Sequence, residues 1–200
     1  MNIFKFLVSK IIILYLKTLG IKINLNANIS KIPFIKIKGN PKNIIIGKVN
    51  ILGKIDLRNR ENGKIIIEDN CKIEDGCKFV SAREGVIKIG KGTIVTMGAI
   101  INGGGSVLIG ENCILGPRII INANEHVFKK GELIKNQGFI HKDIIIGDDC
   151  WFGGNVVVNK GVNIKNGSVV GALSLINQDT EENSINVGIP ARKIAIRSAD

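Results

Sequence analysis

Large apolar residues recur at every sixth position near the C-terminal end of the chain. The positions are Ile146, Phe152, Val158, Ile164, Val170 and Ile176, and a small or β-branched residue often follows four places later. A period of six fits neither an α-helix nor an alternating strand. It is typical of a parallel β-helix, in which a short strand and a turn fill six residues, three hexads make one coil, and coils stack at roughly 4.8 Å. The pattern therefore predicts an all-β solenoid in which the first residue of each hexad, called its leader here, faces inward.

The same repeat extends towards the N-terminus with interruptions. Earlier leaders are placed at Ile46, Leu52, Ile67, Ile73, Phe79, Ile89, Val95, Ile101, Ile109, Leu115 and Ile121. About four residues should bulge out near 83–86, and Gly103 to Gly105 should absorb two extra residues. Residues 20–45 look less regular, because Pro33 and Pro41 break any long strand. This reading gives about six coils.

The repeat stops after Ile121, and the next leader in register, Ile146, follows 25 residues later. Residues 127–145 should therefore leave the solenoid as a loop, and long loops in a regular solenoid usually carry function. The chain has two histidines, His126 at the base of this loop and His141 at its exit. Histidine is the commonest general base at neutral pH, although a lone histidine is more often a surface or packing residue. Position alone leaves both readings of His126 open.

Residues 3–19 are rich in Phe, Ile and Leu, with three lysines interspersed. The longest unbroken apolar run, residues 11–16, is far too short to span a bilayer, which takes about 20 residues. No small-residue cleavage site follows, so a signal peptide is not expected. The segment predicts an amphipathic helix that packs on the solenoid or on a neighbouring chain, or lies in a membrane interface.

The formal net charge of +11 lies entirely in the N-terminal third. Residues 1–66 hold thirteen Lys and Arg against Asp56 and Glu61, whereas residues 67–200 hold fifteen residues of each sign. A basic stretch favours nucleic acid, anionic lipid or phosphorylated glycans as partners, although a general over-use of Lys, Ile and Asn explains it equally well. No nucleic-acid-binding module is recognisable, so nucleic acid is not an expected partner.

The four cysteines share one small, inward-facing hexad position, four residues after a leader. They are Cys71, Cys77, Cys113 and Cys150, and Ser168 and Ser174 fill the same position elsewhere. A buried cysteine behaves as a small hydrophobe, and the absence of a C-x-x-C pair argues against zinc or thioredoxin-like chemistry. Nothing argues for disulfides, so a reducing compartment, the cytoplasm, is expected.

Three motifs carry a resemblance to a known family. They are Glu125-His126 followed by N-Q-G-F at 136–139, I-I-I-G-D-D-C-W-F-G-G at 144–154, and V-G-I-P-A-R-K-I at 187–194. Over residues 65–195 the chain resembles the hexapeptide-repeat, left-handed β-helix acyltransferases, above all the O-acetyltransferases of galactosides, maltose and bacterial surface polysaccharides. The resemblance implies the left-handed winding and a homotrimer with sites between chains. We divide the chain into a helix at 1–22, the β-helix domain at 23–190 and a tail at 191–200.

Matched position by position, the family implies a general base and a binding site for acetyl-CoA, with no metal required. His126 matches the base that deprotonates an acceptor hydroxyl, while His141 matches no functional position and is read as incidental. Glu125, which lacks a family match, is a candidate to orient His126. On the acetyl-CoA side the resemblance implies Trp151 beside the acetyl-pantetheine arm, Gly154 as an oxyanion donor, the Gly171 and Ala172 amides along the pantetheine, Asn177 and Gln178 near the adenine, and Arg192 with Lys193 near the phosphates.

The resulting hypothesis is an acetyl-CoA-dependent O-acetyltransferase acting on a sugar hydroxyl in surface polysaccharide or glycan biosynthesis, in the cytoplasm or at the inner face of the membrane. One alternative is N-acetylation of an amino sugar or an antibiotic. A second alternative, a zinc enzyme of the carbonic anhydrase type, is not expected, because its site needs three histidine ligands and this chain has two histidines. A third alternative is a non-catalytic scaffold, since solenoids commonly serve as binding surfaces.

Overall fold

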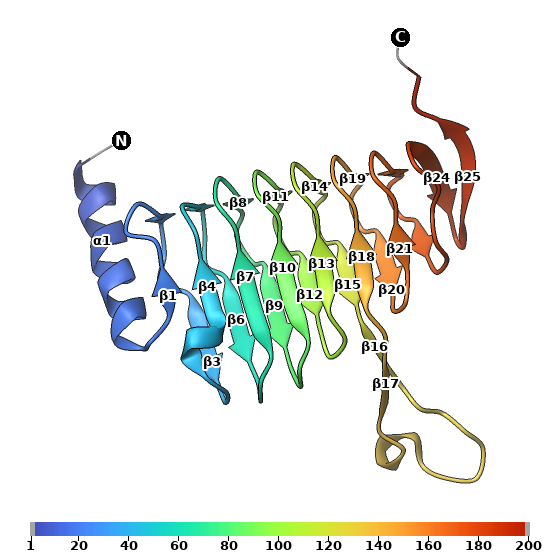
Figure 1. Cartoon of the computed structure of the whole chain (residues 1–200), viewed down its shortest axis with the longest axis horizontal. Helices are drawn as coiled ribbons and strands as arrows, with labels where there is room; N and C mark the ends of the chain where they lie inside the picture. The colour runs from blue at the N-terminus through green and yellow to red at the C-terminus, as the bar shows by residue number, and fades with distance from the viewer. Residues whose placement is uncertain (1–2, 199–200) are drawn as a thin grey trace.

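The computed structural model describes residues 3–198 and shows one long parallel β-helix, with a helix at one end and a β-hairpin at the other (Figure 1). Sheet A contains β1 (Lys22–Ile23), β4 (Ile44–Ile46), β7 (Lys64–Ile67), β10 (Val86–Ile89), β13 (Val107–Ile109), β18 (Ile144–Ile146) and β21 (Asn163–Ile164). Sheet B contains β2 (Asn28–Ile29), β5 (Asn50–Ile51), β8 (Lys72–Ile73), β11 (Ile94–Val95), β14 (Ile114–Leu115), β19 (Trp151–Phe152), β22 (Val169–Val170), β24 (Ser184–Gly188) and β25 (Ala191–Ile196). Sheet C contains β3 (Phe34–Ile37), β6 (Asp56–Asn59), β9 (Lys78–Ser81), β12 (Ile100–Asn102), β15 (Ile120–Asn122), β20 (Val157–Asn159) and β23 (Leu175–Ile176).

The three sheets form the sides of a triangular prism, and the turns between them form its corners. The hexad leaders stack in rows through the centre of this prism. In sheet A the row is Ile23, Ile46, Ile67, Ile89, Ile109, Ile146 and Ile164, each in register with the next. Each sheet A strand contributes one isoleucine to this row, so the row forms a continuous apolar column in the core. The predicted all-β solenoid is confirmed, as is its inward-facing repeat.

The first part of the repeat differs from the prediction. The coils begin at Ile23, and sheets A and C have seven strands each within residues 3–198, so there are seven coils rather than six. Ile51, and not Leu52, is the leader, because Ile51 pairs with Ile73 and is fully buried whereas Leu52 is 47% exposed. The step from Ile46 to Ile51 is five residues, which two adjacent apolar residues conceal in the sequence.

Pro33 and Pro41 do not interrupt this first coil, because both lie in corners. Pro33 immediately precedes β3, and Pro41 begins the short 3₁₀ helix η1 (Pro41–Asn43), which Asn40 caps by accepting a hydrogen bond from the Lys42 N–H. A proline at a corner removes no strand hydrogen bond. The interpretation of residues 20–45 as irregular was therefore wrong.

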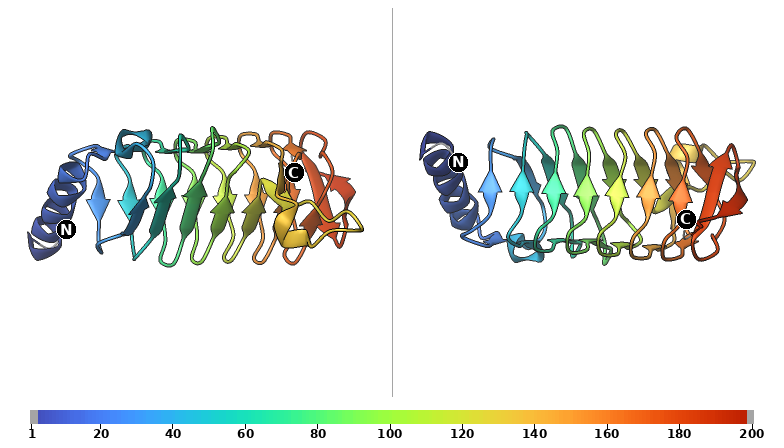
Figure 2. Two further views of the ribbon diagram at one scale, coloured as in Figure 1. Left: turned by 90° about the horizontal axis from the view of Figure 1, so that it is seen from below. Right: turned by 90° about the horizontal axis from the view of Figure 1, so that it is seen from above.

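Helix α1 (Ile3–Thr18) covers the open N-terminal end of the prism (Figure 2). Ile12, Ile13 and Leu16 are buried against the first coil, and the Ser9 hydroxyl accepts a 2.9 Å hydrogen bond from the Ile29 N–H. The helix thus shields the first stacked row from water. Residues 1–2 of the expected N-terminal segment and residues 199–200 of the expected tail lie outside the described residues. Between residues 3 and 198, no helix combines the length and apolar character needed to cross a membrane.

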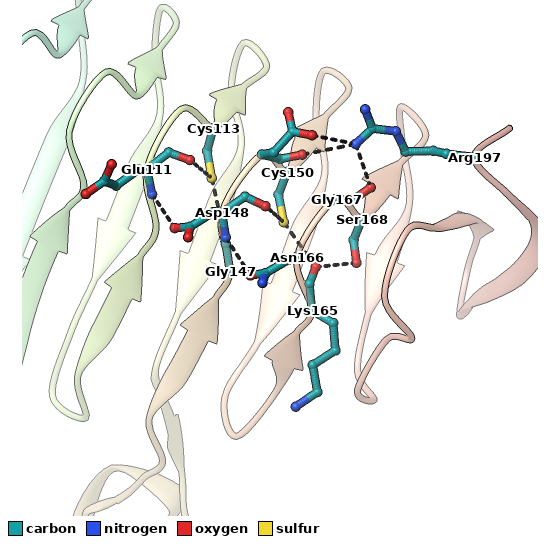
Figure 3. A network of polar contacts seen from close by, with 11 residues as sticks. Glu111, Cys113, Gly147, Asp148, Cys150, Lys165, Asn166, Gly167, Ser168 and Arg197 are labelled. Carbon is teal, nitrogen blue, oxygen red and sulfur yellow. Dashed lines mark hydrogen bonds and ion pairs between the residues drawn. The ribbon is translucent and has the colours of Figure 1, made fainter. Parts of the chain in front are cut away.

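The corners between sheets A and B are held by side chains that bond to the neighbouring coil (Figure 3). Asp148 accepts a hydrogen bond from the Glu111 N–H at 2.7 Å, and Asn166 accepts one from the Asp148 N–H at 2.9 Å. Beneath them the Cys113 thiol faces the Gly147 carbonyl and the Cys150 thiol faces the Lys165 carbonyl, at 3.1 and 3.2 Å. All four cysteines are free and buried, as predicted.

Candidate functional site

The segment between β15 and β18 leaves the prism as an antiparallel ribbon with an extended tip (Figure 1). Its strands are β16 (Asn124–His126) and β17 (Phe139–His141), and the tip contains the 3₁₀ helix η2 (Ile134–Asn136). Gln137 ties the tip together, since its side chain bonds to both backbone groups of Lys129 at 2.7 and 2.9 Å and to the Glu132 carbonyl at 2.8 Å. The excursion therefore starts at Asn124, three residues earlier than expected, and the chain has rejoined the core by the buried Ile144.

One face of this ribbon brings both histidines together. Asn124 pairs with His141 and His126 pairs with Phe139, and paired residues of an antiparallel ribbon share a face. The His126 and Phe139 rings contact each other with centroids 4.0 Å apart and an interplanar angle of 39°. His126 is itself exposed, so its imidazole is accessible to a ligand.

Glu125 faces the other side of the ribbon. Neighbouring residues of a strand point to opposite faces, and the Glu125 carboxylate forms an ion pair with Lys160 on the prism. The hypothesis that Glu125 orients His126 is therefore wrong. The ion pair instead ties the back of the ribbon to the coil below it.

A hollow of about 230 Å³ lies at the root of the ribbon, along the corner between sheets C and A. Its wall includes Arg60, Arg83, Asn102, Asn124, Phe139 and His141. The two glycines after Asn102 form part of the same wall, and a Cβ at Gly104 would collide with the His141 ring. The corner is glycine-rich because the imidazole packs directly against its backbone.

The environment of the hollow shifts the pKa of His141. Burial and then the positive charge of Arg83 lower its pKa from the ordinary value, while Glu61 acts weakly in the opposite direction. Its Nδ1 atom is buried and forms no hydrogen bond with any residue from 3 to 198. The interpretation of His141 as incidental missed its place opposite Asn124, which depends on the register of the ribbon.

The residues matched to acetyl-CoA lie on a different edge of the prism. Trp151 is 54% exposed on the outer side of sheet B, beside Ile114 and Val169 of the adjacent strands. Gly154 and Ala172 occupy successive corners between sheets B and C, joined by a 2.9 Å hydrogen bond from the Leu173 N–H to the Gly154 carbonyl.

The amides at these corners are not equivalent. The Gly171 N–H donates to the Asn186 carbonyl at 2.9 Å and is therefore already used. The N–H groups of Gly154 and Ala172 have no acceptor among the residues that the structure describes. Two unoccupied donors on neighbouring coils can bind the carbonyl oxygens of an extended ligand.

The remaining matched residues lie at the C-terminal end of the prism. Asn177 and Gln178 are exposed just after β23, and Arg192 and Lys193 are exposed on β25. Lys193 forms an ion pair with Glu181, whereas the Arg192 guanidinium bonds only to the carbonyl of Ala191 among the described residues. Of these two cations, Arg192 is thus the one that forms no ion pair within residues 3–198.

His126 and Gly154 lie on different edges of one chain. Gly154 precedes β20, and the ribbon follows the neighbouring strand β15 of the same sheet, so the full length of the sheet C strands separates them. Three residues of strand span about 10 Å, before the turns are counted. The two halves of the predicted site do not meet within one chain.

Comparisons with known proteins agree with this architecture. A family model described as "Hexapeptide repeat of succinyl-transferase" matches residues 143–172. The chain is 32% identical to the dTDP-4-amino-4,6-dideoxy-D-glucose acyltransferase of Escherichia coli, over 67% of this chain and 72% of that protein. It is 36% identical to the galactoside O-acetyltransferase of Escherichia coli strain K12 over 44% of this chain, a match that spans only 43% of that relative.

A crystal structure of a hexapeptide-repeat acetyltransferase from Vibrio cholerae, in complex with acetyl coenzyme A, superimposes with a TM-score of 0.51 at 28% identity. The match covers 73% of this chain and 70% of that one. The sequence match over most of the Escherichia coli acyltransferase, together with the stacked hexads, establishes that this chain belongs to the hexapeptide-repeat acyltransferases, whose fold is the left-handed parallel β-helix.

Proposed function

We propose that this chain transfers the acetyl group of acetyl-CoA to a saccharide, with His126 as the general base. The observation that carries the proposal is the ribbon face on which the exposed His126 imidazole adjoins Phe139 and, beside it, the hollow between sheets C and A. An acceptor that occupies the hollow can present a hydroxyl to His126, whereas a non-catalytic scaffold has no need of this arrangement.

The reaction follows from acyl-transfer chemistry. The His126 imidazole removes the proton of the acceptor hydroxyl, and the oxygen attacks the thioester carbonyl carbon. The Gly154 N–H, which has no acceptor among residues 3–198, donates a hydrogen bond to the developing oxyanion. Collapse of the tetrahedral intermediate breaks the carbon–sulfur bond, the CoA sulfur takes the proton from the imidazolium, and the acetyl ester is released.

The separation of the two edges supports a homotrimer with each site between two copies. The ribbon of one chain would place His126 against the Gly154 and Ala172 edge of its neighbour. Apolar side chains exposed at the ribbon tip, including Phe128, Leu133 and Ile134, and isoleucines exposed on the outer faces of the sheets are available to be buried in such an assembly. Light scattering of the purified protein measures its mass in solution, and a monomeric protein with full activity would contradict this assembly.

The acceptor group distinguishes two forms of the proposal. Similarity to a galactoside O-acetyltransferase supports ester formation on a sugar hydroxyl, and we assign this reaction to surface polysaccharide or glycan biosynthesis. Similarity to an acyltransferase of an amino sugar nucleotide supports amide formation instead. Mild alkali separates them, because it removes an acetyl ester and leaves an amide intact.

The acetyl-CoA site is tested by calorimetric titration of the purified protein. We expect micromolar to submillimolar binding, weakened about ten-fold or more in Arg192→Ala because a charge-assisted hydrogen bond contributes about 1.5–3 kcal/mol. Lys193→Ala should have a smaller effect, since Glu181 already pairs with that charge. Absence of binding at millimolar acetyl-CoA by a folded protein would leave the scaffold as the better reading.

We also propose that the outer face of α1 contacts an anionic membrane surface. Ile3, Ile11 and Leu14 on this helix are 66–78% exposed, and the excess positive charge of the chain lies in the same N-terminal third. Sedimentation with phosphatidylserine vesicles, compared with phosphatidylcholine vesicles, should show binding that Ile11→Asn combined with Leu14→Asn abolishes. Equal sedimentation of the variant, or a loss of oligomer mass in it, would reject the membrane in favour of packing between copies.

A further inference from the structure

Two arginines from successive coils line the hollow at the root of the ribbon. Arg60 directly follows β6, Arg83 follows β9, and these strands are paired in register up to Asn59 and Ser81. The Arg60 N–H also donates to the Ser81 carbonyl at 3.0 Å, which fixes the two corners on top of each other. Successive coils lie roughly 4.8 Å apart, so both guanidinium groups can reach one bound anion.

Both guanidinium groups are unpaired within the described part of the chain. The contrast is Arg58 on the preceding strand, whose guanidinium bonds to both oxygens of Asp56 at 2.7 to 3.0 Å. Glu61 is the one carboxylate that lines the hollow, against two arginines, so the hollow is positively charged overall. Free guanidinium forks suit carboxylate and phosphate oxygens, which they bind with two parallel hydrogen bonds.

The remaining wall suits a sugar. Asn124 supplies both a donor and an acceptor, the buried His141 Nδ1 lacks a partner, and the Phe139 ring offers an apolar surface for a pyranose face. The Phe139 ring also contacts the imidazole of His126, with ring centroids 4.0 Å apart. A saccharide held by its acidic group at the arginines would therefore direct its other end towards the proposed base.

We propose that this hollow selects an acidic saccharide as acceptor, with Arg60 and Arg83 binding its carboxylate or phosphate. The inference rests on the proposed acetyl transfer but goes beyond it, because it names the charge of the acceptor and the residues that read it. Galactosides and other neutral sugars would be poor acceptors by comparison.

The test compares three probes that share one sugar framework. Glucuronate carries a carboxylate, glucose 1-phosphate carries a phosphate, and glucose carries neither. Binding to the wild-type protein without acetyl-CoA is followed by ligand-observed NMR and by titration of the His141 ring proton. We expect the acidic probes to bind at least about ten-fold more tightly than glucose, because charge-assisted hydrogen bonds to the arginines stabilise them. Their affinity should fall at high salt, whereas that of glucose should not. The stronger of the two acidic probes identifies the acidic group.

The bound anion should also leave a signature on His141. Because burial and Arg83 lower the pKa of this imidazole in the free protein, a negative ligand beside it should raise that pKa, and glucose should not. The groups that face the imidazole are Arg60, Glu61 and Arg83 on the coils and Asn124 across the ribbon. A merely structural His141 would titrate alike with all three probes.

The variants are Arg60→Gln with Arg83→Gln, and the matched control is Arg58→Gln, which removes an arginine outside the hollow. We expect the double variant to lose the preference for acidic probes and the control to retain it, with similar melting temperatures. Equal binding of all three probes, or a preference that survives the double variant, would overturn the inference. Acetyl transfer to glucose that is as fast as transfer to the acidic probes, in the wild-type protein as in the double variant, would overturn it while sparing the proposed function. Selective binding of acidic sugars without any transfer would do the reverse.

Discussion

The two edges at opposite ends of the sheet C strands are built by different means. The edge with Gly154 and Ala172 consists of corners whose exposed groups are backbone amides, and their positions follow from the hexad repeat. The edge with His126, Arg83 and His141 consists of long side chains on corners and on a ribbon that departs from the repeat. The repeat can in this way provide a constant binding edge for the proposed acyl donor, while the corners and the ribbon that depart from the repeat can adapt the other edge to the acyl acceptor.

The largest expected effect concerns the base on the ribbon. Replacing His126 with Ala should lower kcat about 10²- to 10⁴-fold, since general base catalysis contributes this much, with little change in the affinity for acetyl-CoA. Thiol release from acetyl-CoA, with the saccharide probes above as acceptors, measures the rate. Lys130→Ala, an exposed change on the same loop, is the control and should keep full activity. A His126→Ala variant that keeps a tenth or more of the activity would show that His126 is not the general base.

The next effect concerns the oxyanion donor on the opposite edge. Pro117 occupies the corner position of the previous coil that Gly154 occupies in its own, and Arg118 and Asn155 follow with φ of 57° and 56°. The corner therefore accepts a proline backbone, and Gly154→Pro deletes the N–H while adding a Cβ that would lie 3.3 Å from the Pro117 ring, a contact that an alanine at this position shares. We expect kcat to fall about 10²- to 10³-fold, the usual loss for one oxyanion donor. Gly154→Ala retains the N–H, and Ala172 shows that an alanine fits the same corner one coil further on, so this variant should stay near the wild-type rate. Equal rates for the two variants would reject this role.

A smaller effect is expected one coil further on. Leu173 has a φ of 61°, so Ala172 holds the same corner position again, and Ala172→Pro should preserve the turn while deleting an unused donor. Loss of one neutral hydrogen bond costs about 0.5–1.5 kcal/mol, so the Kd for acetyl-CoA should rise about two- to ten-fold. Calorimetry measures it, with Ala172→Gly as the control that keeps the amide. An unchanged Kd would show that this amide does not face the ligand.

The contrast between the edges also explains what the sequence could predict. The family resemblance singled out Gly154 and Ala172, and it could be carried to single residues because the six-residue period fixes the place of most corners. One short step was still enough to shift the leader from Leu52 to Ile51. The convergence of Arg60, Arg83 and His141 could not be predicted in this way. It depends on the lengths of two corners and on the pairing of Asn124 with His141, neither of which the period contains. The triplet of glycines at 103–105 was the available signal, since it marks a close approach of another group.

The smallest effect concerns the core that both edges share. Burial raises the pKa of the Cys71 and Cys77 thiols to about 11, above the value of an exposed thiol. Because the folded state then retains protons that the unfolded state loses, stability is fully present at neutral pH and falls as the pH rises from about 9 towards 11. Ser168 and Ser174 fill the equivalent position elsewhere, so Cys71→Ser with Cys77→Ser should fold and show a flatter fall of melting temperature over this range. Both edges should keep their ligand affinities at pH 7 in this variant, because the thiols lie inside the prism and contact neither. An identical alkaline decline in the two proteins would show that other groups dominate it, and an altered acetyl-CoA affinity would show that the core and the donor edge are coupled.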